Sequence, residues 1–391
     1  MSGLNSTPSG ERIHIAFFGN RNAGKSSLVN AFTGQEISIV SDTKGTTTDP
    51  VSKSMELLPL GPVKIIDTAG LDDEGTLGEM RVSKTLDILN KTDIAVIVSE
   101  KEGDEAEILK VIKEKNIPFI ICKNKADLLE KIPEDKDNII YVSAKTGYGI
   151  AALKEKVASL SKKEERVLVS DLIDPLDTVI LVVPIDKSAP KGRLILPQQQ
   201  TIRDILDKGG IPVVCKDSEL KETLNKLKDK PRLVITDSQV FSFVKDIISE
   251  SVPLTSFSIL MARYKGDLPL LKSGAEAIEN IRTGDKILIA EGCTHHRQCE
   301  DIGTVKIPAM IRKKTGAEPE FHFVSGGDFP KDLEGYKMII HCGGCMLNSA
   351  EIASRLEKAK EKGIPITNYG TLIAYLNGIL ERATAPFKKS Y

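Results

Sequence analysis

The stretch GNRNAGKSS at residues 19–27 decides how the first part of the chain folds. The apolar run IHIAFF precedes it, and it leads into the amphipathic run SLVNAFTG. Between a strand and a helix, the pattern G-x-x-x-x-G-K-S is typical of a phosphate-binding loop, whose glycines let backbone N–H groups wrap around phosphates. We expect Lys25 to reach the β- and γ-phosphate oxygens and the Ser26 hydroxyl to ligate Mg²⁺. The alternative is a glycine turn that only joins a strand to a helix.

Four later segments carry polar residues at expected strand ends or in loops. They are KGTTTD at 44–49, VKIIDTAG at 63–70, IPFIICKNKADLL at 117–129 and IIYVSAKTG at 139–147. Asp67 ends a buried strand, where a carboxylate can hold Mg²⁺ through water. The Asp127 carboxylate can accept both N1–H and N2–H of guanine, whereas adenine has no such pair of donors on that edge. The sequence therefore favours GTP over ATP, although NKAD taken alone could be a helix N-cap with solvated charges.

Taken in this order, the five segments resemble the motifs of the small G-protein family over about residues 11–160. The resemblance implies a P-loop domain that binds GTP with Mg²⁺ and hydrolyses it. The nucleotide-binding residues that it implies are Gly19, Asn20, Asn22, Ala23, Gly24, Lys25, Ser26, Ser27, Asn124, Lys125, Asp127, Ser143, Ala144 and Lys145. The implied Mg²⁺ ligands are Ser26, Thr47 and Asp67, and the implied catalytic set is Lys25, Asn22, Thr47 and Gly70.

Two details of these motifs bear on hydrolysis. Leu71 follows DTAG where Ras-like proteins carry the glutamine that orients the attacking water, so we expect slow intrinsic turnover. Asn22 and the segment GTTTD resemble GTPases of the TrmE and Era type, in which an asparagine at this place helps to hold K⁺. The resemblance implies that K⁺ supplies the charge of an arginine finger and that Thr47 ligates Mg²⁺, with Thr46 and Thr48 as register alternatives. Asn22 could equally be a polar filler of the loop.

Composition limits the class of protein. The 391 residues are enough for roughly two or three domains. Lys and Arg (54) nearly cancel Asp and Glu (55), so net charge gives no argument for nucleic acid or an anionic membrane as a partner. The first residues lack an apolar signal core and the apolar runs are too short to span a bilayer, so we expect a cytoplasmic protein. There, the six cysteines are expected to be thiols or metal ligands rather than disulfides.

After the helix that closes the first domain, the pattern of the chain changes. Short apolar runs such as DTVILVV, IPVVC and RLVIT alternate with amphipathic segments, which indicates a parallel α/β layer of three or four strands. We expect domains at 1–165, 166–263 and 264–391, all of the α/β class, with the P-loop domain first. A thin sheet leaves an exposed edge, so we expect the domain at 166–263 to form a homodimer. The stretch SAPKGRLILPQQQ shows no catalytic constellation and is interpreted as an extended connection.

Cysteines and histidines follow two apolar runs in the last third of the chain. The run KILIA precedes Cys293 and His295, and KMII precedes His341, Cys342 and Cys345. In a parallel α/β layer both loops open at the same edge, so we expect these side chains to lie together. The glycines of C-G-G-C let both thiolates face one metal centre, because a bare backbone turns without side-chain clashes.

The spacing leaves the identity of the metal open. With Cys299, four thiolates suit a tetrahedral structural zinc. Without it, three thiolates suit a [4Fe–4S] cluster with one iron open or held by a weaker ligand, such as histidine or a carboxylate. A thioredoxin-type dithiol is a further alternative, but it gives Cys293 and the histidines no role.

The combination of a G domain, C-T-H near 293, H-C-G-G-C near 341 and APKGRLILPQQQTIRDILD between them resembles the HydF family of [FeFe]-hydrogenase maturation GTPases. The resemblance implies a [4Fe–4S] cluster on Cys293, Cys342 and Cys345. It implies that His295 and His341 either ligate the cluster or donate hydrogen bonds beside it. His296 and Cys299 lie outside the core motif, and a Cys299 ligand would close the open iron position.

The function that this resemblance implies is that of a GTP-hydrolysing scaffold and carrier. Such a protein works with two radical-SAM maturases and delivers the diiron precursor of the active site to apo-[FeFe]-hydrogenase. A K⁺-dependent GTPase in RNA modification or ribosome assembly, with a structural zinc, is the alternative; balanced charge and the lack of a recognisable RNA module argue against it. A redox protein with a vestigial GTP site is a second alternative, which the complete guanine-reading set argues against.

Overall fold

The computed structural model describes residues 7–20, 22–36, 51–68, 84–100, 103, 105–161, 167–185, 194–292 and 301–387. The chain forms two compact units, of which the first holds residues 1–164 and 348–351 and the second holds residues 165–347 and 352–391. The described residues contain three separate β-sheets, one of six strands and two of four strands.

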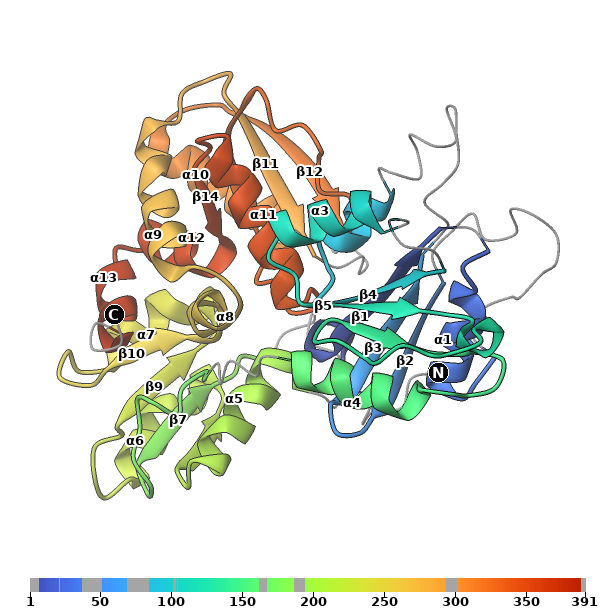
Figure 1. The fold of residues 1–391 in the computed structure, drawn as a ribbon. Helices are drawn as coiled ribbons and strands as arrows, with labels where there is room; N and C mark the ends of the chain where they lie inside the picture. Colours follow the sequence, from blue (N-terminus) through green and yellow to red (C-terminus); the bar gives the residue numbers. More distant parts are fainter. Residues whose placement is uncertain are drawn as a thin grey trace. The chain divides into compact units, whose positions relative to one another are not determined.

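The first unit contains the six-stranded sheet, with the strand order β2-β3-β1-β4-β5-β6. Its strands are β1 (Ile13–Gly19), β2 (Val51–Leu57), β3 (Gly61–Asp67), β4 (Ile94–Ser99), β5 (Phe119–Lys123) and β6 (Ile139–Tyr141). Its helices are η1 (Ser9–Glu11), α1 (Lys25–Thr33), α3 (Ala106–Glu114), η2 (Ala126–Leu128) and α4 (Ile150–Leu160), and residues 84–89 are also helical. Strand β2 is antiparallel to β3, and the other pairs are parallel. Figure 1 shows β1, β3, β4 and β5 side by side.

Strand β1 explains why this sheet is covered on both faces. Successive side chains of a strand point to opposite faces, and every residue from His14 to Gly19 is buried. Ile15 and Phe17 join one hydrophobic core, and Ala16 and Phe18 join another. Phe17 meets Phe32 of α1 edge to face, with ring centroids 5.4 Å apart. The continuous apolar run IHIAFF therefore forms a central parallel strand, as such runs do.

The second unit begins with the four-stranded sheet β10-β9-β7-β8, in which all pairs are parallel. Its strands are β7 (Thr178–Val182), β8 (Ile211–Cys215), β9 (Leu233–Thr236) and β10 (Leu254–Ser256). Its helices are α5 (Leu196–Asp207), η3 (Asp217–Glu219), α6 (Leu220–Lys226), η4 (Ser238–Val240), α7 (Phe241–Ile247) and α8 (Phe257–Lys265). Strand β8 forms one edge of the sheet.

The third sheet, also in the second unit, has the order β12-β11-β13-β14, and all its pairs are parallel. Its strands are β11 (Lys286–Glu291), β12 (Glu320–Ser325), β13 (Tyr336–His341) and β14 (Ile366–Asn368). The helices around it are α9 (Leu268–Glu276), η5 (Ala277–Asn280), the π-helix η6 (Ile302–Lys306), α10 (Ile307–Thr315), α11 (Ser349–Glu361), α12 (Tyr369–Leu376), α13 (Leu380–Thr384) and η7 (Ala385–Phe387). One hydrophobic core joins this sheet to the preceding one.

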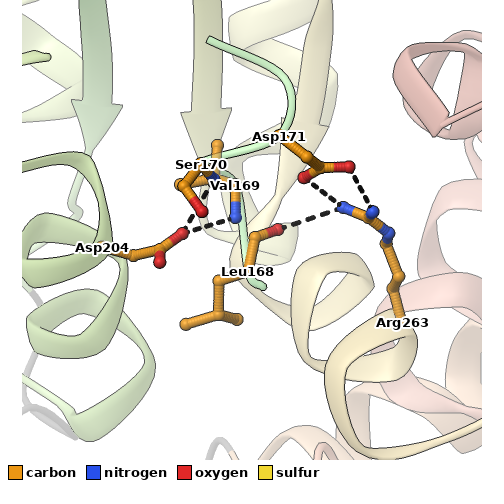
Figure 2. A network of polar contacts seen from close by, with 6 residues as sticks. All are labelled: Leu168, Val169, Ser170, Asp171, Asp204 and Arg263. Carbon is orange, nitrogen blue, oxygen red and sulfur yellow. Dashed lines mark hydrogen bonds and ion pairs between the residues drawn. The ribbon is translucent and has the colours of Figure 1, made fainter. Parts of the chain in front are cut away.

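A polar network holds the first described segment of the second unit. Asp204 of α5 accepts hydrogen bonds from the backbone N–H groups of Val169 and Ser170, both at 2.8 Å. Arg263 of α8 pairs with Asp171 and donates to the carbonyl oxygen of Leu168. Figure 2 shows Asp204 and Arg263 on opposite sides of the segment. Because both helices hold the same short segment, the start of this unit has a defined path.

The expected fold class is confirmed, since the first sheet carries a P-loop and two smaller parallel α/β sheets follow. The proposed domain limits 1–165, 166–263 and 264–391 remain a proposal. Within the described ranges, no helix is both long enough and apolar enough to span a lipid bilayer.

Candidate nucleotide and metal sites

In two of the sheets, the strand order reverses next to the polar motifs. In the first sheet β1 lies between β3 and β4, and in the third sheet β11 lies between β12 and β13. Parallel sheets bind ligands outside the carboxyl ends of their strands, at the point where the strand order reverses. In the first sheet this point is the loop after β1, and in the third sheet it lies between the loops after β11 and β13.

The loop after β1 brings an ammonium, a hydroxyl and a carboxylate together. The Lys25 ammonium pairs with Asp67 at the end of β3, and both side chains are buried. The Ser26 hydroxyl donates to the other Asp67 oxygen at 2.8 Å. Lys25 and Ser26 are the first residues of α1, so they lie at the positive end of the helix dipole. This set suits a phosphate with Mg²⁺, because it offers a cation for the anion and oxygen ligands for the metal.

Gly24 is required by both its conformation and its surroundings. It precedes α1 with φ 77° in the left-handed region. A Cβ atom there would lie 2.4 Å from the amide nitrogen of Asn124. Asn22 is also left-handed, with φ 63°, and its side chain is exposed. Left-handed residues of this kind occur in anion-binding loops, in which successive backbone N–H groups face the anion.

The base-reading segments contact one another and the P-loop. The Asn124 amide donates to the carbonyl oxygen of Ala23 at 2.9 Å and accepts from the N–H of Ala144 at 3.2 Å. The Ser143 hydroxyl donates to one Asp127 oxygen at 2.6 Å. Because Asp127 is exposed, its carboxylate is accessible to a base. The segments NKAD and SAK therefore lie against each other next to the P-loop.

Some of the remaining predicted residues of the nucleotide site are described by the structure, and the others are not. Lys125 is left-handed, with φ 63°, and its ammonium donates to Glu100 at 2.5 Å. Gly19 ends β1 and Asn20 lies in the loop after it. Ser27 lies in the first turn of α1, and Lys145 lies in the loop after β6. Thr47 and Gly70, with the alternatives Thr46 and Thr48 and the residue Leu71, lie outside the described residues.

The second site lies at the ends of β11 and β13. We call residues 342–347 the cysteine loop. The backbone N–H of Gly292, the residue before Cys293, donates to the Cys342 sulfur at 3.0 Å, and the N–H of Gly344 donates at 3.4 Å. The N–H of Cys342 donates to the carbonyl oxygen of Ala290 at 2.9 Å. The ends of β11 and β13, which precede the two predicted loops, therefore lie side by side at one edge of the sheet.

Burial and hydrogen bonds act in opposite directions on the Cys342 thiol. Burial raises the pKa of the Cys342 thiol to about 11, although the N–H groups of Gly292 and Gly344 oppose the increase. Cys345 is partly exposed. Backbone N–H donors aimed at sulfur are the contacts that a metal-bound thiolate uses, so the chemistry of this loop fits a thiolate ligand.

His341 is held on both ring nitrogens. Arg355 donates to Nε2 at 2.9 Å, and Nδ1 lies 2.7 Å from the carbonyl oxygen of Cys342. A guanidinium can only donate, so Nε2 accepts and Nδ1 carries the hydrogen. Burial and the charge of Arg355 lower the pKa of His341 to about 4, so the ring is neutral at pH 7. This arrangement suits a residue that orients the cysteine loop rather than one that ligates a metal.

The predicted metal site is only partly within the described residues. Cys293 and His295, with His296 and Cys299, lie outside the described residues. Within the described ranges, no group of three or more His, Cys, Asp and Glu side chains is arranged to hold a metal ion. The structure thus describes two of the three predicted cysteine ligands, Cys342 and Cys345.

Three residues near the cysteine loop were not predicted. Lys265 at the end of α8 donates to the carbonyl oxygen of Leu347 at 3.0 Å, and Arg355 holds His341. Glu291, at the end of β11, accepts from the Tyr369 hydroxyl at 3.2 Å. Lys265 ends an apolar helix, where a basic residue is ordinary, so the sequence carries no signal for this role.

Comparison with known families separates the three sheets. Residues 168–266 match the hydrogen maturase F dimerization domain, and residues 269–386 match the hydrogen maturase F tetramerization domain. The chain belongs to the hydrogen maturase F family. Residues 14–125 match the 50S ribosome-binding GTPase model, so the first sheet is part of a GTPase domain. These matches confirm the resemblance inferred from the motifs.

The curated relatives resemble the G domain. The tRNA modification GTPase MnmE of Dichelobacter nodosus is 34% identical over 163 residues, which are 39% of this chain and 36% of that protein. MnmE of Francisella tularensis subsp. novicida is 34% identical over 158 residues, which are 38% of this chain and 35% of that protein. The chain therefore spans about a third of the length of these relatives.

Solved structures also resemble part of the chain. A probable GTP-binding protein EngB is 23% identical with a TM-score of 0.30, over 38% of this chain and 97% of that one. Era in complex with MgGDPNP and nucleotides of 16S ribosomal RNA is 19% identical with a TM-score of 0.33, over 57% of this chain and 91% of that one.

Proposed function

We propose that the chain is a GTP-hydrolysing scaffold and carrier for maturation of [FeFe]-hydrogenase. It holds a [4Fe–4S] cluster on Cys293, Cys342 and Cys345, receives the diiron precursor with the help of two radical-SAM maturases, and delivers it to apo-hydrogenase. The observation that carries the cluster site is the 3.0 Å hydrogen bond from Gly292 N–H to the Cys342 sulfur. It brings the residue before Cys293 to the sulfur of the next cysteine motif, at the point where the strand order reverses.

The residues around the cysteine loop suit such a cluster. Cys342 accepts two backbone N–H bonds, and His341 is fixed in one tautomer by Arg355. A cluster held by three thiolates would offer one iron whose fourth position can exchange its ligand. His341 is an outer residue in this proposal, because both of its ring nitrogens already have partners. His295 is proposed either to ligate the cluster or to donate a hydrogen bond beside it.

Metal analysis after anaerobic purification tests the cluster. We expect about four iron atoms per chain and an EPR signal after reduction, whereas zinc would give no EPR signal. Cys342→Ser should lose most of the iron. Cys215→Ser is the matched control, since Cys215 is buried in another sheet and should leave the iron content unchanged. Zinc in place of iron, or full iron in Cys342→Ser, would favour the alternative of a GTPase with a structural zinc.

The nucleotide site supports GTP and Mg²⁺ as ligands. Lys25 and the N-terminal end of α1 would neutralise the β- and γ-phosphates, and Ser26 with Asp67 would hold Mg²⁺. The accessible Asp127 carboxylate would accept the two donors of guanine. These residues make GTP hydrolysis the reaction of this domain in our proposal.

We also propose that K⁺ assists hydrolysis at Asn22. This residue is exposed and left-handed at the P-loop, so its amide oxygen is accessible to a cation beside the phosphates. Hydrolysis measured in KCl should exceed hydrolysis in NaCl at equal ionic strength. Asn22→Ala should remove this difference, while equal rates in both salts for the unchanged protein would contradict the K⁺ role.

We propose that β8 forms the homodimer interface in the 168–266 domain. Strand β8 is an edge strand, and its residues Ile211 and Val214 are each 45% exposed. An edge strand with exposed apolar side chains is a template for pairing with a second copy. Val214→Lys should reduce the mass measured by light scattering. Phe243→Lys on α7, a second exposed apolar residue of this domain, is the control and should leave the mass unchanged.

A further inference from the structure

Lys265 is a buried lysine that contacts the cysteine loop. Its side chain is 3% exposed, and its ammonium lies 3.0 Å from the carbonyl oxygen of Leu347 and 3.4 Å from that of Cys345. Both oxygens belong to the cysteine loop, so Lys265 holds the backbone at the second cysteine of the C-G-G-C motif and again two residues after it. Lysine is rarely buried, because removing an ammonium from water is costly.

The lysine and the loop come from different domains of the same unit. Lys265 ends α8, within the segment that matches the dimerization domain, whereas the cysteine loop belongs to the segment that matches the tetramerization domain. Both segments share one hydrophobic core, to which Leu260 and Met261 of α8 and Ile339 of β13 contribute. The position of the ammonium is therefore fixed by packing rather than by the loop that it contacts.

A second cation lies on the same side of the cysteine loop. Lys265, Arg355, His341 and Cys342 line one small cavity of about 20 Å³. Arg355 is 5% exposed and donates to His341 and to the carbonyl oxygen of Gly326. In a buried site charges are screened less than at the surface, so these two cations would act on a negatively charged group bound at the cysteine loop.

We propose that Lys265 is a positioning residue that presets the cysteine loop and raises the reduction potential of the cluster held there. The proposal rests on the proposed [4Fe–4S] site. A [4Fe–4S]²⁺ cluster with three thiolates carries one net negative charge, and reduction adds a second. A nearby cation stabilises the more negative state more, so its charge favours reduction.

Two readouts test the two parts of the proposal. The first is the midpoint potential of the reconstituted cluster, followed by EPR during a redox titration. The second is hydrogen exchange of the cysteine-loop amides in the iron-free protein. Lys265→Met removes the charge with little change of volume. Lys245→Met is the matched control, because Lys245 is another lysine of the dimerization domain that donates to a backbone carbonyl, that of Asn377, at 3.3 Å.

In Lys265→Met we expect a potential lower by about 59 mV, which is a tenfold change in the ratio of reduced to oxidised cluster. We also expect faster exchange of the loop amides. Lys265→Arg keeps the charge and should recover most of the potential, and Lys245→Met should change neither readout. If Lys265→Met does not fold, Lys265→Gln keeps N–H donors without the charge, and its potential is expected to fall in the same way.

An unchanged potential in Lys265→Met, or in Lys265→Gln, overturns the proposal even if exchange becomes faster, because Lys265 would then only support the loop. An equal loss of potential in Lys245→Met also overturns it. A wild-type protein that takes up no iron–sulfur cluster contradicts the proposed function instead. In that case unchanged exchange in Lys265→Met overturns the positioning role, and faster exchange supports it.

Discussion

The nucleotide site and the cysteine site both lie where the strand order of a parallel sheet reverses, yet they are built differently. In the nucleotide site the motifs contact one another: Lys25 pairs with Asp67, and Asn124 reaches the P-loop. In the cysteine site the thiol of Cys342 is held by backbone N–H groups, and Lys265 contacts the loop from another domain. A site whose residues all belong to recognisable motifs can be predicted from the sequence. A site that also depends on residues of another domain can be predicted only in part.

The largest expected effect is on GTP affinity, and it tests whether the residues of the P-loop motif bind the nucleotide themselves. Lys25→Met leaves the Asp67 carboxylate buried without its ammonium, and breaking a buried pair in this way costs about 3–5 kcal/mol. The variant also loses the cation that faces the phosphates, so we expect GTP affinity to fall by roughly 100-fold or more. Titration with a fluorescent GTP analogue measures this loss.

Lys53→Met is the control for that experiment. Lys53 is an exposed residue of β2 in the same unit, so its replacement should leave the affinity unchanged. Equal affinities of Lys25→Met and the unchanged protein would show that the P-loop does not bind phosphate through Lys25.

The second effect tests whether one motif depends on the next. Ser143→Ala removes the 2.6 Å hydrogen bond to Asp127. A hydrogen bond to a charged group contributes about 1.5–3 kcal/mol, so we expect GTP affinity to fall roughly 10- to 100-fold. The loss of affinity should be smaller for inosine triphosphate, which lacks the exocyclic amine whose hydrogen bond Asp127 would accept. Ser159→Ala removes a hydroxyl that donates to the backbone carbonyl oxygen of Lys156 in α4, at an exposed position. This variant should change the affinity for neither nucleotide.

The third effect compares adjacent glycines of the cysteine loop. Gly344 has φ 63°, and a Cβ atom there would lie 2.5 Å from the Cδ1 atom of Ile352. At Gly343 an added Cβ atom meets nothing within 4 Å. The left-handed conformation costs an ordinary residue about 1–2 kcal/mol. Gly344→Ala should therefore retain iron roughly 5- to 30-fold less firmly against a chelator, whereas Gly343→Ala should match the unchanged protein. Equal iron retention in the two variants would contradict the requirement for a left-handed glycine.

These glycines also show what could be predicted. The pattern C-G-G-C predicted that a bare backbone is needed between the cysteines, but only the structure shows that the need falls on Gly344. The order of strand, loop and helix around the P-loop was predicted, since these elements follow one another directly in the chain. Local order of that kind leaves a pattern in the sequence.

Contacts between distant segments left no such pattern. Lys265 and Leu347 lie far apart in the sequence, and the hydrogen bond between them depends on how α8 packs against the third sheet. Arg355 lies in α11 and His341 ends β13, so their hydrogen bond also joins two different elements. Such partners follow from tertiary packing, which hydrophobic periodicity indicates only as a buried face.

The smallest expected effect concerns a buried histidine of the G domain. The ring nitrogens of His14 lie 3.0 Å from the carbonyl oxygens of Lys91 and Ser9, and the backbone N–H of His14 donates to the Asp93 carboxylate at 2.8 Å. A neutral ring can donate to only one of those carbonyls, so protonation would add a bond, and Asp93 also favours it. Burial, together with a smaller contribution from the charge of Lys64, outweighs both influences and holds the pKa of His14 below its ordinary value of 6.5. The expected change of stability with pH is therefore small, because the influences that lower and raise the pKa of His14 oppose each other.

The sign follows from proton binding in the two states. Below about pH 6.5 the unfolded chain binds a proton at His14 that the folded domain does not bind, so the G domain loses stability as pH falls. Calorimetry between about pH 7.5 and 5.5 should show a lower midpoint for the transition that Mg²⁺ and GDP raise. His14→Gln should flatten this dependence, whereas His322→Gln, at an exposed position of β12, should leave it unchanged. A dependence that persists in His14→Gln would assign the proton to another group of the G domain.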